Sequence, residues 1–237
     1  MKDLPFMKSL SAALFFMTIV LLGVVPLPVW AQTDVAVSGY GAFNQSSKSS
    51  YTSQTPSNQA GVLIEVRHIW SPLVGFEGSY AYNRANQTYS VPQNYSCPPG
   101  TNPGCSHVVS ASVPANAHEI TGDWVVSAKV LHFRLFALAG GGLLFDVPST
   151  ANASFVFSCT PSGATCLPGA IDSSTRSQTK GVFVYGGGMD WALLPHLGLR
   201  FQYRGNVYKA PALVDSFSST GKFTHTAEPM FGVFFRF

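Results

Sequence analysis

Four cysteines fall in two close pairs, Cys97 with Cys105 and Cys159 with Cys166. Each pair lies in a segment rich in proline, glycine and serine, which is typical of exposed loops. In an exported protein, this spacing favours two local disulfides that pin the loops. Metal binding is the alternative chemistry, but neither segment has a CxxC spacing or a clustered second ligand beyond His107. We expect disulfides here and no metal site.

The residue most similar to a catalytic one is a histidine near the end of an expected strand. His225 lies between Thr224 and Thr226, whereas a lipid-deacylating enzyme would need a serine and a histidine close together, and no His-x-Ser occurs there. A lone histidine at such a position is far more often solvated. The other histidines of the expected strands and turns are scattered: His68, His118, His132 and His196. The sequence therefore predicts no catalytic residue, no metal, no cofactor and no enzymatic activity.

The acids and bases recur at alternate positions, opposite apolar residues. Only 11% of the residues are charged, well under half of the roughly 25% usual in soluble domains. In one segment, Leu199 and Phe201 alternate with Arg200 and Gln202, and this period of two predicts a strand with two unlike faces. If the apolar face meets lipid, a charged network collects inside. Its expected members are Glu65, Arg67, Glu77, Glu119, Asp123, Lys129, Arg134, Asp146, Lys180, Asp190, Arg200, Arg204, Glu228 and Arg236.

Such a network admits two interpretations. Unpaired buried charges cost several kcal/mol each, so the two signs should pair and form a hydrogen-bonded plug. The alternative is that the same residues line a narrow conductive or proton-relay path. Paired charges in a confined interior are more often packing than transport, so the sequence favours the plug.

Eight segments of the chain carry this alternation, from 34–43 to the C-terminal residues 228–237. Only the first segment leaves its phase open, because it is rich in glycine. The connections alternate in length. Short turns are expected near 71–73, 131–132 and 194–196, and long polar loops at 44–58, 84–115, 148–179 and 210–223. This rhythm predicts antiparallel hairpins with the short turns at one rim and the long loops at the other.

The N-terminal residues have the composition of a secretory signal. Lys2 and Lys8 precede an uncharged apolar run over 10–25, and Val29-Trp30-Ala31 ends in a small residue. The run is shorter than the roughly 20 residues of a spanning helix. We expect a signal peptide at 1–31 and one β-barrel domain at 32–237.

Three stretches then resemble the small eight-stranded outer-membrane barrels, the OmpA-like and OmpX-like proteins. They are the terminal strand 231–237, the glycine-rich 40–43 and the glycine-rich 137–145. The resemblance implies an all-β fold: an eight-stranded antiparallel up-and-down transmembrane barrel with short periplasmic turns and long extracellular loops. It also implies insertion by the outer-membrane assembly machinery, which reads an aromatic C-terminus and alternate apolar residues. Those positions are Phe231, Val233, Phe235 and Phe237.

The expected function follows from this location in the bacterial outer membrane. We predict a structural or surface-interaction protein whose partners are outer-membrane lipid, lipopolysaccharide, the assembly machinery and an unknown surface ligand. The loops at 94–107 and 157–168 are the expected recognition sites. A net charge of +3 is too modest to indicate nucleic acid. The alternatives are a narrow porin-like channel and a secreted lipocalin-like binder, which would bury its apolar face inward around a ligand.

Overall fold

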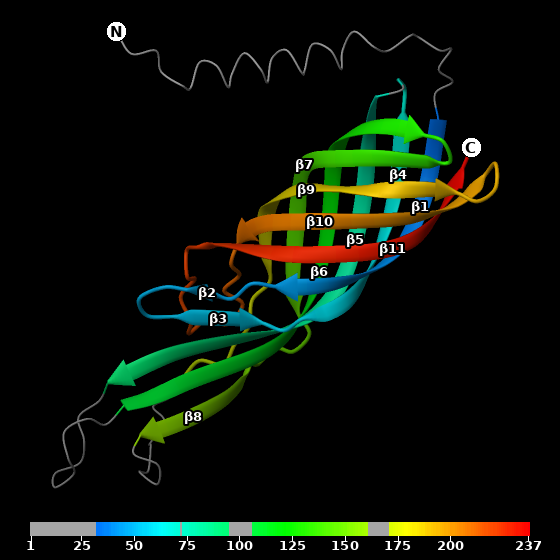
Figure 1. Ribbon diagram of the computed structural model, residues 1–237. Coiled ribbons are helices and arrows are strands. Elements are labelled where there is room, and N and C mark those ends of the chain that lie inside the picture. Colours follow the sequence, from blue (N-terminus) through cyan, green and yellow to red (C-terminus); the bar gives the residue numbers. More distant parts are fainter. Residues whose placement is uncertain (1–31, 72, 95–105, 161–170) are drawn as a thin grey trace, which may run out of the picture. The chain divides into compact units, whose positions relative to one another are not determined.

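The computed structural model describes residues 32–71, 73–94, 106–160 and 171–237 (Figure 1). The expected signal peptide at 1–31 and three of the four cysteines lie outside these residues. Of Cys159 only the backbone is described. The signal peptide and the two disulfides therefore stay predictions. Within the described ranges, no helix is long and apolar enough to cross a membrane.

Eight long strands form a closed ring. Each pairs antiparallel with two neighbours in the order β1-β4-β5-β6-β7-β9-β10-β11, and β11 pairs back to β1 (Figure 1). The predicted eight-stranded antiparallel barrel is confirmed. Its strands are β1 (Gln32–Asn44), β4 (Gln59–Ile69), β5 (Val74–Asn94), β6 (Ser106–Val130), β7 (Phe133–Pro148), β9 (Gln178–Ala192), β10 (Leu197–Lys209) and β11 (Phe223–Arg236).

The ring closes between the first strand and the last. Asp34 is the partner of Arg236 at one end of this pair, and Asn44 is the partner of Thr226 at the other. The amide of Phe237 also donates to the carbonyl of Thr33 at 2.9 Å. Closing the ring removes the free strand edges that would otherwise expose unpaired backbone groups.

Short turns gather at one rim of the barrel. Two residues, Leu131 and His132, connect β6 to β7, and Leu131 adopts a positive φ of 56°. The connections over 70–73 and 193–196 are comparably short, and the long connections lie at the other rim. Gln32 and Phe237 both end at the short-turn rim (Figure 1). The alternation of short turns and long loops is thus confirmed.

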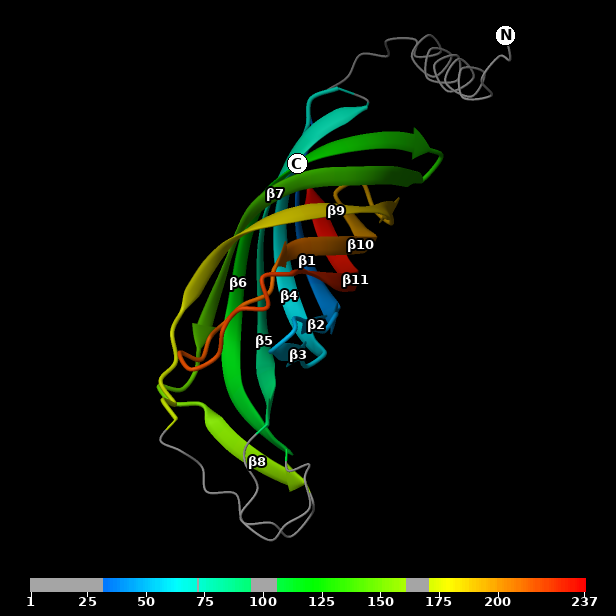
Figure 2. The same cartoon turned by 90° about the vertical axis from the view of Figure 1, so that its left-hand side faces the viewer.

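The predicted loop at 84–115 is wrong over most of its length. β5 continues to Asn94 and β6 begins at Ser106, so the hairpin extends beyond the barrel wall (Figure 2). β3 (Ser53–Pro56) pairs with β5, and β8 (Ser154–Thr160) pairs with β6. The short β2 (Ser47–Lys48) pairs with β3. We call β3, β8 and the parts of β5 and β6 beyond the barrel (85–94 and 106–115) the platform.

The platform has its own apolar core. Tyr89, Val109, Ala111 and Val113 from β5 and β6 pack with the connection between β10 and β11, through residues that include Leu213. The Tyr89 hydroxyl donates to the carbonyl of Pro211 at 3.1 Å and accepts from the amide of Leu213 at 3.1 Å. Burial of one face explains why serine-, threonine- and proline-containing segments form strands here, since tertiary packing overrides weak propensity.

Candidate functional site

The wall of the barrel separates charged and apolar side chains by strand parity. On β4, Leu63, Glu65 and Arg67 are fully buried, whereas Val62 and Ile64 are 52% and 46% exposed. Successive side chains of a strand point to opposite faces, so the register of a strand fixes which face each of its side chains occupies. On this strand the acid and the base therefore point into the barrel together with Leu63, and Val62 and Ile64 point out.

Arg200 on β10 lies at the centre of the first interior cluster. It donates to Asp190 through Nε at 2.8 Å and to Asp34 through Nη2 at 2.7 Å. Its Nη1 lies 3.3 Å from Oε2 of Glu65. These side chains come from β10, β9, β1 and β4, and each has at most 1% of its surface exposed. One guanidinium thus links four strands across the interior.

Arg67 completes this cluster from β4. Its Nε donates to Glu77 on β5 at 2.7 Å, and its Nη1 lies 3.3 Å from Asp190. Asp190 therefore bridges the two arginines. Because both guanidinium groups are shared between carboxylates, the cluster satisfies buried charges that would be costly alone.

Two phenylalanines cover the guanidinium groups. The Cζ atom of Arg67 lies 3.9 Å from the ring centroid of Phe136, and that of Arg200 lies 5.5 Å from the centroid of Phe234. Cations within about 6 Å of an aromatic face are attracted to it. The rings fill space in the interior that water would otherwise occupy.

Arg204 forms a second cluster nearer the loop rim. It donates to Glu119 at 3.1 Å and to the hydroxyl of Thr121 at 3.1 Å. Asn206 donates to the other oxygen of Glu119 at 2.9 Å. Asp123 lies 3.9 Å from Arg204 and accepts from Thr121 at 3.0 Å. The side chains of the two clusters together span the middle of the barrel.

The loop end of the interior holds fewer bases. Lys180 lies 2.9 Å from Asp146, but Glu228 is buried and has no ion pair among the described residues. The hydroxyls of Tyr208 and Thr226 are 3.0 Å apart in the same region. Tyr208 therefore faces the interior, on the same parity of β10 as Arg204 and Asn206.

Three residues of the predicted network lie at the short-turn rim. Lys129 is exposed near the end of β6, so its predicted place inside the barrel is wrong. It has the parity of the inward residues, but the strand has already left the barrel there. Arg134 donates to Gln32 at 2.5 Å, and Arg236 lies 5.1 Å from the ring of Phe234. Both are half-buried at this rim.

Asp34 was not among the residues expected inside the barrel, but it is fully buried and paired with Arg200. Parity could have placed it, because Asp34, Ala36 and Ser38 alternate with valines in the sequence. The structure buries all three residues. The glycine-rich run after Ser38 obscured the phase of this strand. Partner choice could not have been found from sequence, since Asp34 and Arg200 are 166 residues apart.

Two small cavities lie toward the two ends of the interior. A cavity of about 30 Å³ lies toward the loop rim, lined in part by Glu119, Asp146 and Glu228. A second of about 80 Å³ lies at the short-turn rim beside Arg134. A water needs roughly 10–15 Å³ of such space, so the first cavity holds a few waters at most. In the described residues, no group of acids, histidines or cysteines is placed to hold a metal ion.

Aromatic side chains mark both edges of the apolar outer band. Near the short turns, the rings of Trp70 and Trp124 meet edge to face at 5.8 Å. Toward the loops, the Tyr80 hydroxyl lies 2.8 Å from Nδ1 of His118, and that of Tyr185 lies 3.0 Å from Nε2 of His225. His225 thus contacts a tyrosine. Amphipathic rings at two levels are typical of the two interfaces of a membrane.

Between these aromatic levels the outer surface is apolar. Exposed members of the band include Val37, Val62, Ile64, Val66, Ile120, Val126, Leu135, Leu143, Phe201, Phe231, Val233 and Phe235. A closed antiparallel barrel with charges inside and apolar residues outside is the architecture of transmembrane β-barrels, and this chain has that architecture. The arrangement is the opposite of the lipocalin-like alternative, which required an apolar interior.

No family model and no curated protein matches the sequence. Three similar solved structures are the attachment invasion locus protein Ail of Yersinia pestis in complex with the heparin analogue sucrose octasulfate, Neisserial surface protein A, and the outer membrane protein OprG from Pseudomonas aeruginosa. Their sequence identities are 13%, 14% and 12%, and their TM-scores are 0.44, 0.48 and 0.48. They match 88%, 88% and 86% of this chain and 100%, 100% and 95% of their own.

Only small parts of the two expected recognition segments lie in the described residues. The recognition segment 94–107 lies mostly outside the described residues, and of 157–168 only 157–160 are described, in β8. The four residues of the expected assembly signal all point outward from the end of the chain: Phe231, Val233, Phe235 and Phe237.

Proposed function

We propose that the protein is a non-enzymatic surface-interaction protein of the bacterial outer membrane, with a lumen closed by its own ion pairs. One observation carries the proposal: a barrel filled by side chains supports a packed, four-stranded platform at its loop rim. A rigid wall that projects a rigid sheet is suited to presenting a surface, because ordered contact residues lose little entropy on binding.

The closed lumen rests on the two arginine clusters. Arg67, Arg200 and Arg204 are each fully buried and bonded to acids on other strands. Opening a path for ions would require these pairs to separate in a confined interior, where each unpaired charge costs several kcal/mol. The porin-like alternative is therefore disfavoured.

Planar-bilayer recording tests the closed lumen. The purified protein should insert without producing discrete conductance steps. The variant with Arg200→Ala and Arg67→Ala removes both guanidinium groups and serves as the comparison for an opened interior. Regular steps from the wild-type protein would support the channel instead.

The outward face of the platform carries regular rows of hydroxyl groups. Ser53, Ser90 and Ser110 are register partners across three strands, and the hydroxyls of Ser90 and Ser110 lie 2.9 Å apart. The next row consists of Thr55, Thr88, Ser112 and Ser154. No charged residue occurs in either row. This face offers hydrogen bonds without charge, which suits an uncharged polar partner such as a saccharide.

An array of neutral oligosaccharides, probed with the detergent-solubilised protein, tests this face. The variant with Ser90→Lys and Ser110→Lys should lose retention on the array, because two ammonium groups disrupt the hydroxyl row. Ser216→Lys together with Ser218→Lys, on an exposed connection, is the matched control and should bind as the wild type does. If the wild type retains no saccharide, or the face variant binds normally, the platform is not the recognition surface.

The C-terminal strand is the proposed signal for the assembly machinery. Phe231, Val233, Phe235 and Phe237 share the outward face of the last strand. They are accessible before that strand closes the ring against β1. An accessory factor could therefore bind this apolar row on the unclosed chain.

A further inference from the structure

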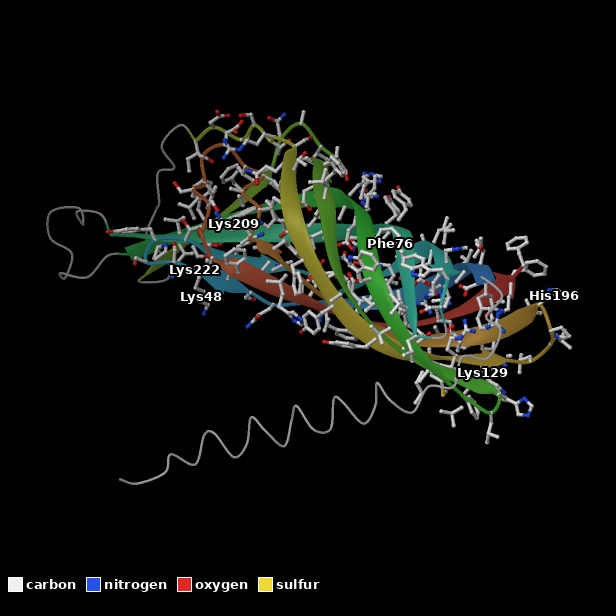
Figure 3. The ribbon with its side chains drawn as sticks, turned by 90° about the horizontal axis from the view of Figure 1, so that it is seen from above. Lys48, Phe76, Lys129, His196, Lys209 and Lys222 are labelled. Carbon is white, nitrogen blue, oxygen red and sulfur yellow. The ribbon has the colours of Figure 1, made fainter. Side chains whose placement is uncertain are left out.

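Three lysines lie at the loop-side ends of three adjacent strands. Lys209 ends β10, Lys222 precedes β11, and Lys48 follows β1 in the short β2. Lys222 accepts at its carbonyl from the amide of Ala210 at 3.0 Å, and the neighbouring side chains Ser47 and Thr220 are hydrogen-bonded at 3.0 Å. Figure 3 shows the three lysines at one end of the barrel and Lys129 at the other. We call Lys48, Lys209 and Lys222 the lysine arc.

No carboxylate balances the lysine arc. Every acid after position 31 lies in the described residues, and eight of them are buried inside the barrel: Asp34, Glu65, Glu77, Glu119, Asp123, Asp146, Asp190 and Glu228. The other two are occupied elsewhere. Asp215 lies 3.4 Å from Arg176, and Asp172 accepts from the amide and hydroxyl of Ser174 at 2.9 and 2.7 Å. Among the described residues, no carboxylate forms an ion pair with Lys48, Lys209 or Lys222. The arc is therefore an uncompensated cluster of positive charge.

The lysine arc lies at the edge of the lipid-facing band. Lys209 follows Phe201, Tyr203 and Val207 on the outward parity of β10, and its Nζ lies 6.0 Å from the ring centroid of Phe223. Phe223 is itself 67% exposed. Lysines directly beyond an aromatic belt extend their ammonium groups to the level of lipid headgroups.

A shallow apolar depression, which we call the glycine groove, lies in the outer surface below the arc, on β4, β1 and β11. Its lining includes the small residues Gly39, Gly41, Ala60 and Gly61, together with Phe231. A Cβ atom on Gly39 would meet nothing within 4 Å. Gly41 is three residues from the loop-side end of β1, so the groove lies in the half of the band nearer the loops.

We propose that this face binds one phosphorylated lipid of the lipopolysaccharide type, with its phosphates on the lysine arc and an acyl chain in the glycine groove. The inference rests on the proposed function, because it needs the loop rim to face the outer leaflet. Two independent features support it: a cationic arc without ion pairs at headgroup level, and a shallow apolar depression beneath it. An anionic headgroup with a saturated tail complements both.

Native mass spectrometry of the detergent-solubilised protein with bisphosphorylated lipid A measures this binding. The variant with Lys48→Gln, Lys209→Gln and Lys222→Gln should bind about 100-fold more weakly, since each lysine near a phosphate contributes about 1 kcal/mol. Gly39→Leu should weaken binding about tenfold by filling the groove. The wild-type protein should bind dephosphorylated lipid A about as weakly as the lysine variant binds bisphosphorylated lipid A.

The controls are matched to each change. Lys129→Gln removes a lysine at the opposite rim, and Gly78→Leu adds a side chain on the outer face of β5, where a Cβ also meets nothing within 4 Å. Both should bind lipid A as the wild type does. A shift in gel mobility on heating, kept by every variant, establishes that the barrel is folded, and loss of that shift in the wild type would count against the proposed function instead.

Three results would overturn the proposal. One is that the lysine variant and Gly39→Leu both bind lipid A normally. The second is that phosphate removal has no effect on the wild type. The third is that heparin binds the wild-type protein through the three lysines while lipid A binding ignores them, which would assign the arc to a soluble polyanion.

Discussion

Arg200 and Asp190 form a two-pronged ion pair between adjacent strands at the centre of the barrel. Nε of Arg200 donates to Oδ1 of Asp190 at 2.8 Å, and Nη2 donates to Oδ2 at 3.1 Å. The two residues are register partners on β10 and β9, so the backbone ladder holds them at this separation. Asp190 also contacts Arg67, and the pair therefore joins opposite parts of the wall.

Arg200→Met should destabilise the folded barrel by about 3–5 kcal/mol, because it leaves buried carboxylates without their cation. Unfolding in urea, followed by tryptophan fluorescence in lipid vesicles, measures the loss. Adding Asp34→Leu should recover part of it, because Arg200 provides the one ion pair that Asp34 has among the described residues. Arg176→Met, which removes an exposed pair, should cost less than about 1 kcal/mol. Equal effects for the Arg200 and Arg176 variants would mean that the interior pairs are not structurally important.

Gly142→Ala should weaken the contact between β6 and β7. A Cβ atom on Gly142 would overlap the backbone carbonyl of Ile120, and overpacking of this kind costs about 1–3 kcal/mol. Gly181→Ala is the control, because nothing lies within 4 Å of its Cβ position. Refolding yield from urea into detergent, read from mobility on an unheated gel, compares the two. A Gly142 variant that refolds as well as the control would contradict the packing described here.

Tyr89→Phe should loosen the connection between β10 and β11 from the platform. The change leaves the amide of Leu213 and the carbonyl of Pro211 without their partner, at a cost of about 1–3 kcal/mol. Amide exchange at Leu213 should accelerate while exchange in the barrel strands stays unchanged. Tyr51→Phe, at a side chain that is 80% exposed, should alter neither. Unchanged protection at Leu213 would show that the hydroxyl does not hold this segment.

Phe237→Ala should reduce insertion in cells without preventing refolding in detergent. The residue is outward-facing and makes no interior contact, so its removal should leave the barrel itself intact. Phe223→Ala, at the other end of the same strand, should leave insertion unchanged. Outer-membrane yield and detergent refolding, measured together, separate the two effects. A loss of both in the Phe237 variant would indicate a structural role in place of an assembly signal.

Strand number, strand phase and turn positions could be predicted because each depends on local pattern. Ile64 and Glu65 show this, since adjacent positions on one strand have opposite character and opposite exposure. The rim position of Lys129 could not be predicted, because parity says which face a residue shares and not where the strand leaves the barrel. The platform strands were also missed, since Ser110 and its neighbours owe their structure to partners distant in sequence.

The pairing of charges could not be predicted for a related reason. Alternation placed Arg204 and Glu119 on the inward face of their strands, but 85 residues separate them. Their contact depends on strand order, tilt and register around the closed ring. Phe136 is an apolar residue on the charged face of its strand, and only the structure shows that it lies against Arg67.

Transfer of magnetisation from lipid acyl chains to methyl groups tests the inside-out arrangement most directly. In lipid vesicles, NMR cross-peaks should connect acyl protons to Ile64 and Ile120, which point outward, and not to Leu63 and Val125, which are buried. Strand parity predicts this division between the two isoleucines and the two buried residues. Cross-peaks to Leu63 and Val125, with none to the two isoleucines, would contradict it.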